Sequence, residues 1–201
     1  MDLGLVTKYF YPHRILDIGA NIGQFHQTAR QYFPESYIFS IEASDACEPS
    51  LKQITDQYFI GLLTRDESVY NFYTRKDTDT CTGNSIYREL TSWFADDNLK
   101  VVRKQGHRLD DLFTEDSTFD LIKIDTQGSE LDIISGGKNL CSRAQGILLE
   151  VSLTQYNENS PLIDEVHRFM SNFGYEPKEL LGVIRNQNGE IFQNDILYIK
   201  R

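Results

Sequence analysis

A glycine-rich turn near the start of the chain limits what the sequence can fold into more than any other feature. It is Asp-Ile-Gly-Ala-Asn-Ile-Gly at 17 to 23, and it continues the short apolar run RILDI at 14 to 18. Apolar side chains then recur at helical spacing over 24 to 33, and Pro34 follows them. The pattern predicts a strand, a tight turn and a helix, which is how a nucleotide-type site opens in an α/β sheet.

The spacing of the glycines narrows the class of ligand. Gly19 and Gly23 form GxxxG, whereas dinucleotide folds use GxGxxG, and Asp17 at the strand end would repel a pyrophosphate. The same carboxylate would attract the ammonium of a methionine moiety and would suit a sulfonium charge. We therefore expect S-adenosylmethionine here, bound by Asp17, Gly19, Ala20, Asn21 and Gly23. A turn that binds no ligand is the alternative.

A second acidic residue stands where the ribose of such a ligand would lie. Glu42 directly follows a β-forming run at 37 to 41 and comes 19 residues after Gly23. An acid at the end of the second strand can accept hydrogen bonds from both ribose hydroxyls. We expect Glu42, together with Ala43, to bind the adenosine.

Further runs along the chain predict the rest of a sheet. Strands are expected at 58 to 63, 119 to 124 and 147 to 153, and the near-continuous apolar character of 119 to 124 suits a strand covered on both faces. A helix is expected to open at 160 to 161, where serine precedes proline, and to end at Gly174.

The C-terminal residues predict a β-hairpin. Two strands, about 179 to 185 and 191 to 199, are joined by a segment that contains Asn188 and Gly189. The expected fold is α/β and Rossmann-like, with a mostly parallel sheet that this hairpin closes. With 201 residues, the chain is expected to form a single domain over 1 to 201.

The region from 64 to 105 does not fit this alternation and is interpreted as an insertion. Only 13 residues precede the first strand, so no N-terminal capping domain is expected. A long non-repeating segment inside a compact domain more often has a function than none. We expect the insertion to form part of the acceptor pocket, with Asn84, Ser85 and Tyr87 binding the acceptor. Trp93 and Phe94 are expected to anchor the segment to the core.

The sequence resembles the FkbM-type methyltransferase family. The similarity lies in ILDIGANIGQF at 15 to 25, Ile41-Glu42, LIKIDTQGSELDIISG at 121 to 136, and LLEVS at 148 to 152. The residue after Glu42 is alanine, where the family often has proline. The resemblance implies a class I methyltransferase fold, S-adenosylmethionine as methyl donor, and a hydroxyl acceptor, often on a sugar or a secondary metabolite.

The catalytic candidates are three residues, Asp125, His107 and Glu150. Asp125 ends the strand at 119 to 124 and is expected to act as general base or to orient the acceptor hydroxyl, the alternatives being a donor contact or a helix N-cap. Lys123 shares its face of the strand, and we expect it to be structural and to pair with Glu150. His107 is a candidate base because histidine is the residue type most often used for proton transfer near neutral pH, although a structural or exposed histidine is the alternative.

Composition and charge exclude several classes of partner. The formal net charge of −10 and the pI near 4.8 disfavour nucleic acid and anionic membranes, which leaves a small-molecule or glycan acceptor. The chain has no apolar run long enough to cross a bilayer and no signal-peptide pattern, so a cytoplasmic location is expected. Cys47, Cys81 and Cys141 are odd in number and far apart, which predicts reduced thiols.

No metal is expected at the site. Catechol-type methyltransferases bind magnesium with an Asp-Asn pair after the fifth strand, and that strand ends here in Glu150-Val151-Ser152. The sequence therefore predicts an S-adenosylmethionine-dependent O-methyltransferase. Two alternatives remain: a catalytically inactive methyltransferase-like domain that serves as a scaffold, and a nucleotide-linked oxidoreductase, which the missing GxGxxG disfavours.

Overall fold

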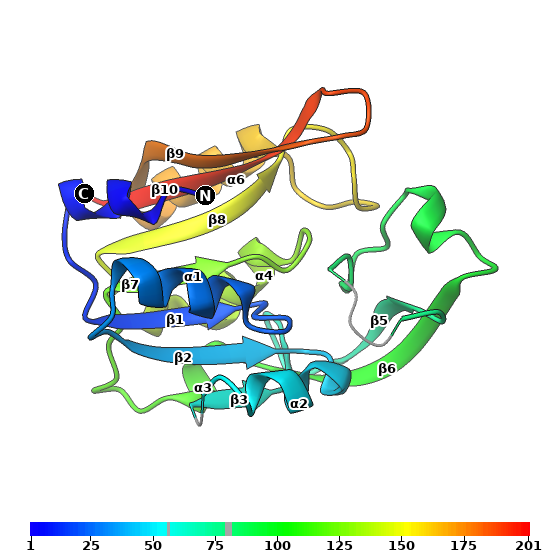
Figure 1. Ribbon diagram of the computed structural model, residues 1–201, viewed down its shortest axis with the longest axis horizontal. Coiled ribbons are helices and arrows are strands. Elements are labelled where there is room, and N and C mark those ends of the chain that lie inside the picture. Colours follow the sequence, from blue (N-terminus) through cyan, green and yellow to red (C-terminus); the bar gives the residue numbers. More distant parts are fainter. Residues whose placement is uncertain (56, 79–81) are drawn as a thin grey trace.

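The computed structural model describes residues 1–55, 57–78 and 82–201, so Cys81 lies outside the described residues. A seven-stranded sheet forms its centre (Figure 1). Its strands are β1 Arg14–Ile18, β2 Tyr37–Glu42, β3 Tyr58–Ile60, β7 Leu121–Ile124, β8 Gly146–Ser152, β9 Tyr175–Arg185 and β10 Ile191–Lys200. They lie in the order β3-β2-β1-β7-β8-β10-β9. The strands from β3 to β8 in this order are parallel, whereas β10 is antiparallel to β8 and to β9. The predicted, mostly parallel α/β sheet with its C-terminal hairpin is therefore confirmed.

Helices cover both faces of this sheet, with α1 on one side and α4 and α6 on the other (Figure 1). The helices are α1 Gln24–Tyr32, α2 Glu48–Leu51, α3 Leu109–Leu112, α4 Glu130–Gly136, α5 Lys138–Cys141 and α6 Ile163–Phe173, with short 3-10 helices η1 Leu3–Lys8, η2 Asp45–Cys47 and η3 Ser92–Phe94. Helix α6 ends, as predicted, at Gly174, which has φ +94°. That left-handed conformation favours glycine because it has no Cβ.

The face of the sheet towards α4 and α6 is apolar along the parallel strands. Leu16 and Ile18 of β1, Ile122 and Ile124 of β7, and Leu149 of β8 are almost fully buried in one cluster. Since side chains alternate along a strand, the residues between them point to α1. The α4-α6 side therefore supplies a continuous hydrophobic core.

The face towards α1 divides into two halves. Near the amino ends of the parallel strands it is apolar, with Ile15, Ile38, Leu121, Leu148 and Leu197 packed against α1 and η1. Near their carboxyl ends it becomes polar, and the buried or half-buried side chains there are Ser40, Glu42, Asp17, Lys123, Glu150, Gln193 and Asp195. Buried polar groups are costly unless they are paired, so this half of one face is where a site is expected.

The predicted insertion carries most of a second sheet. Strands β4 Leu62–Leu63, β5 Val69–Arg75 and β6 Leu99–His107 form it in the order β4-β6-β5. Figure 1 shows the β5-β6 ribbon extending from the carboxyl edge of the large sheet. The single strand predicted at 58 to 63 is wrong, because the chain changes sheets at Gly61: β3 pairs with β2, and β4 pairs with β6.

Helix α4 fixes the insertion to the body of the protein. Asp132 of α4 accepts hydrogen bonds from the Arg65 guanidinium and, at 2.8 Å, from the Tyr87 hydroxyl. Arg65 precedes β5 in the chain and Tyr87 follows it, so one buried carboxylate holds the insertion on both sides of this strand. Within the described ranges, no helix is long and apolar enough to span a membrane.

Candidate functional site

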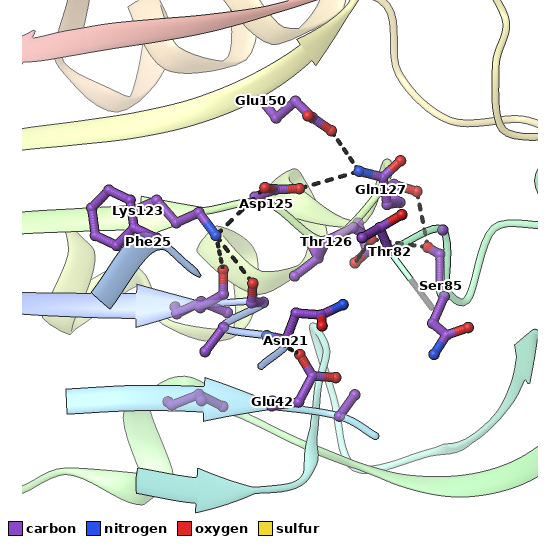
Figure 2. Close-up of a pocket in the computed structure, with 18 of the residues that line it drawn as sticks. Asn21, Phe25, Glu42, Thr82, Ser85, Lys123, Asp125, Thr126, Gln127 and Glu150 are labelled. Carbon is purple, nitrogen blue, oxygen red and sulfur yellow. Dashed lines mark hydrogen bonds and ion pairs between the residues drawn. The ribbon is translucent and has the colours of Figure 1, made fainter. Parts of the chain in front are cut away.

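A cavity of about 500 Å³ lies at the carboxyl edge of the large sheet. It is lined by the β1-α1 turn, the end of β2, residues 82 to 86 of the insertion, the segment after β7, and the end of β8. Figure 2 shows polar side chains from these elements converging on it. A volume of this order accommodates a ligand the size of S-adenosylmethionine.

The glycines of the turn are required by contacts within the chain. Gly19 has φ +74°, and a Cβ placed there would lie 1.8 Å from the carbonyl oxygen of Asp125. Gly23 has φ +91°, and its Cβ would lie 2.5 Å from Ile54. The turn needs glycine at Gly19 because the segment after β7 lies against it, and at Gly23 because Ile54 does. Any side chain at Gly19 would disturb the fold before it reached a ligand.

The amides of the turn are already engaged. The N–H groups of Gly19 and Ala20 both donate to the Ile41 carbonyl, at 2.9 and 3.0 Å. The Asn21 amide donates to Glu42 Oε2 at 2.7 Å, and the Gly23 amide donates to the Ala20 carbonyl at 2.8 Å. A pyrophosphate cradle needs amides that point at the ligand. This turn therefore does not provide the anion site of a dinucleotide fold.

Glu42 faces the cavity from the end of β2 and is only 8% exposed. Its two oxygens accept hydrogen bonds from the amides of Asn21 and Ser44, each at 2.7 Å. Burial raises the pKa of Glu42, and these amide bonds oppose the shift. The amides fix the carboxylate in one orientation and leave each oxygen a second lone pair for a ligand hydroxyl. Ala43 also lines the cavity, and its carbonyl accepts a hydrogen bond from Lys104 of β6 at 2.6 Å.

The expectation that Asp17 meets the ligand directly does not match the structure. Asp17 is fully buried and does not line the cavity, because Lys123 of the adjacent strand lies against it with Nζ 3.3 Å from Oδ1. Lys123 also ion-pairs with Asp125 at 3.5 Å and donates to the Gly19 carbonyl at 3.1 Å. Burial would lower the pKa of Lys123, but the carboxylates of Asp125 and Asp17 outweigh it and raise that pKa.

Lys123 is thus a paired cation, as predicted, but its partners are not the one expected. Glu150 accepts its hydrogen bonds from two amide groups instead, at 2.6 Å from Gln127 Nε2 and 2.8 Å from Gln193 Nε2. Gln127 also donates to Asp125 at 3.2 Å and so stands between the two carboxylates (Figure 2). Burial raises the pKa of Glu150 well above its ordinary value, and the nearby charge of Asp125 adds to the shift.

The segment after β7 is held by a residue that the sequence did not single out. Glu130, the first residue of α4, accepts hydrogen bonds from the amides of Thr126 and Gly128 at 2.9 and 3.0 Å. This leaves Asp125 outside the helix cap, since the residue at the N-cap position is Ser129. The N-cap role considered for Asp125 is therefore wrong. Its side chain is one-third exposed and lines the cavity.

The three acceptor-binding candidates of the insertion separate in the structure. Asn84 lines the cavity, and neither its Oδ1 nor its Nδ2 has a hydrogen-bond partner among the described residues. Ser85 also borders the cavity, but its hydroxyl donates to the carbonyls of Thr126 and Gln127 at 3.0 and 2.9 Å and so ties the insertion to the β7 segment. Tyr87 does not line the cavity, because its hydroxyl is directed to Asp132.

His107 lies away from the cavity, so its role as a base is not supported by its position. It ends β6, pairs with Leu63 of β4, and packs edge-on against Phe59 with 5.6 Å between ring centroids. Trp93 is 54% exposed and stacks with the Arg75 guanidinium, so the expectation of a core anchor is wrong for it; the adjacent Phe94 is buried. In the described part of the chain, no group of three His, Cys, Asp or Glu residues is arranged to hold a metal ion.

The fold and site together define a class I methyltransferase: a GxxxG turn after β1, an acid at the end of β2, and a hairpin-closed parallel sheet. A family model described as the methyltransferase FkbM domain matches residues 17–177. The chain belongs to the FkbM methyltransferase family. A comparison with curated proteins gives no significant match.

Solved structures give the same fold at low identity. Methyltransferase FkbM from Methylobacillus flagellatus KT is 16% identical with a TM-score of 0.54, and the match covers 93% of this chain and 43% of that one. This chain thus spans less than half the length of that structure. Magnesium protoporphyrin IX methyltransferase (ChlM) from Synechocystis PCC 6803, with bound SAM, is 10% identical with a TM-score of 0.54 and coverage of 98% and 74%. A TehB-like SAM-dependent methyltransferase from Corynebacterium glutamicum is 11% identical with a TM-score of 0.53 and coverage of 98% and 85%.

Proposed function

We propose that this protein transfers a methyl group from S-adenosylmethionine to a hydroxyl of a small acceptor, such as a sugar or a secondary metabolite. The observation that carries the proposal is that two carboxylates, Glu42 and Asp125, line the same cavity. Glu42 stands at the end of β2 and Asp125 after β7, and each is fixed by groups of the chain itself. S-adenosylmethionine supplies an electrophilic methyl group on a positively charged sulfur.

Glu42 binds the ribose hydroxyls of the donor through the lone pairs that the backbone amides leave open. Asp17 does not contact the donor but positions other residues that do. It forms an ion pair with Lys123, which donates a hydrogen bond to the Gly19 carbonyl and forms a second ion pair with Asp125. Gly19, Ala20, Asn21 and Gly23 shape the wall of the donor site rather than offering it free amides.

Asp125 is the residue that orients the acceptor and receives its proton. The acceptor oxygen forms a bond to the methyl carbon while the carbon–sulfur bond breaks, the bonding pair stays on sulfur, and the hydroxyl proton leaves to the carboxylate. In-line placement at about 3 Å contributes most of the gain in rate. Asn84 fits the acceptor side, because a buried carboxamide without a partner costs about 1–3 kcal/mol and a hydroxylated ligand would pair with it.

A labelled-donor screen against sugars, glycolipids and polyketide-like alcohols tests the proposal. We expect a saturable O-methylated product whose rate falls by about 10²–10⁴ in Asp125→Asn, which keeps the shape and loses the proton acceptor. Asp116→Asn, at an exposed loop position, is the matched control. We also expect turnover to survive EDTA.

Three outcomes would contradict the proposal. An N-methylated product would replace the hydroxyl acceptor with an amine. Donor binding without any product would favour a scaffold. Activity lost on chelation and restored by magnesium would make Asp125 a metal ligand.

A further inference from the structure

The end of the cavity beyond Asp125 is lined by aromatic and apolar side chains. Tyr156, in the loop after β8, and Phe192, on β10, both border it and are half-buried. Their ring centroids are 5.0 Å apart and their planes are tilted by 46°. Ile184 of β9 completes this apolar wall. The two rings are neighbours in the cavity wall, and aromatic side chains of this kind pack against the apolar face of a ligand ring.

Hydrogen bonds fix the backbone segments that carry these two rings. The Leu90 amide of the insertion donates to the Tyr156 carbonyl at 2.9 Å, and the Leu153 amide donates to the Phe192 carbonyl at 2.8 Å. The Asn157 side chain also donates to the Tyr87 carbonyl at 2.9 Å. The backbone at both rings is therefore in place before any ligand binds, which lowers the entropic cost of binding.

Carboxyl groups outnumber cations at this end of the cavity. Asp125 and Glu150 line it, and Asp195 lies opposite Glu150 on the adjacent strand. Lys123 is the only basic side chain in the described lining, and its charge is already shared by Asp17 and Asp125. The amino group of Met1, which also lines the cavity, acts on Asp195. A phosphate or carboxylate brought beside Asp125 would meet a like charge at low dielectric.

We propose that Tyr156 and Phe192 form an aromatic subsite for an uncharged acceptor, which packs an apolar ring face on them while its hydroxyl reaches Asp125. This assignment rests on the proposed function and narrows its substrate class. Both the C–H face of a sugar ring and an aromatic ring have the required chemistry. Phosphorylated acceptors bind more weakly than neutral ones, because the charge of Asp125 repels them.

Saturation-transfer NMR on the protein saturated with S-adenosylhomocysteine tests the subsite with three probes. Methyl β-D-glucoside offers a sugar face, benzyl alcohol an aromatic face, and glucose 6-phosphate an anion. We expect at least one neutral probe to bind, and whichever binds more tightly identifies the kind of ring. Glucose 6-phosphate should bind at least tenfold more weakly than that probe.

Variants then test the two rings. Phe192→Ala should weaken the neutral probe about tenfold, the scale of a lost aromatic contact and its burial, and Tyr156→Leu should weaken it similarly. Tyr156→Phe should retain binding, because it keeps the ring. Leu180→Ala, at an exposed position of the same hairpin, is the matched control. Unchanged calorimetric affinity for S-adenosylhomocysteine shows that each variant is folded.

The failure of this assignment differs from the failure of the proposed function. If S-adenosylhomocysteine does not bind to the wild type, the proposed function fails first. If it binds but glucose 6-phosphate matches the neutral probes, if no probe binds, or if Phe192→Ala changes nothing, the aromatic subsite is wrong while the donor site stands.

Discussion

The two faces of the large sheet use the same strands and bury very different groups. The face towards α4 and α6 is apolar along the parallel strands, with side chains such as Ile122 and Leu149 fully buried. The face towards α1 is apolar only near the amino ends of the parallel strands and then presents a row of buried ionisable and amide groups. One face holds the protein together, and the polar half of the other arranges the chemistry.

This division explains why the polar half can be both buried and ordered. Most of its charged groups are bound by another group of the chain: Asp17 by Lys123, Glu42 by two amides, and Glu150 by two glutamines. Asn84, at the edge of this region, has a carboxamide with no hydrogen-bond partner among the described residues. Such satisfied networks are rigid, and a group without a partner marks where a ligand is expected to bind.

The largest effect is expected from removing the cation of the polar half. Lys123→Met leaves Asp17 as a buried, unpaired carboxylate, and we expect the free energy of unfolding to fall by about 3–5 kcal/mol. Burial already raises the pKa of Asp17, so the folded variant gains stability when a proton binds, and the loss should be greater at pH 8 than at pH 5. Urea unfolding at the two pH values measures this difference.

A double variant controls that experiment. Asp17→Asn in the Lys123→Met background removes the charge together with its partner, and we expect most of the stability to return. If the double variant is as unstable as the single one at every pH, the ion pair does not account for the burial of these residues.

A change on the opposite face should be somewhat smaller and of a different kind. Leu149→Ala opens a cavity in the continuous core and should cost about 2–5 kcal/mol, independent of pH. Calorimetry on the folded variant should give wild-type affinity for S-adenosylhomocysteine. A large loss of affinity would mean that the apolar face also determines donor binding on the α1-facing side.

The smallest effect concerns Glu130, which holds the segment after β7. Burial raises its pKa from 4.5 to about 7, so between these values the folded protein binds more protons than the unfolded chain. Its contribution therefore lowers stability as the pH rises through this range. In Glu130→Gln the thermal midpoint, relative to wild type, should rise between pH 5 and pH 8, and each 1 kcal/mol of stability that the wild type loses in this range moves the difference by about 2–4 °C in a domain of this size. Parallel curves would show that Glu130 does not titrate here.

Much of the fold could be predicted because its patterns are local. The apolar run at 14 to 18, the GxxxG turn and the Gly174 cap each depend on neighbouring residues, and the structure has all three. The run at 58 to 63 was wrongly predicted as one strand, because its apolar pattern continues across Gly61 although the chain passes there from the large sheet to the second sheet. The alternation of residues along a strand does not show which other strand it pairs with.

The site was predictable only as far as single positions determine it. Glu42 stands at a strand end, and the structure has it facing the cavity. Asp17 and Lys123 were assigned different roles because their pairing depends on the register of β1 against β7, which the sequence does not contain. Asn84 and Ser85 are adjacent and both polar. The Ser85 hydroxyl is hydrogen-bonded to two backbone carbonyls, whereas the Asn84 carboxamide has no hydrogen-bond partner among the described residues. Only tertiary contacts separate them.

A crystal structure with S-adenosylhomocysteine would locate the methyl donor relative to the polar half of the sheet. We expect the ligand to lie along the polar half of the α1-facing side, with its ribose hydroxyls on Glu42, its sulfur towards Asp125, and Asp17 still paired with Lys123. A ligand bound elsewhere, or a direct contact between Asp17 and the amino-acid end with Lys123 displaced, would contradict it.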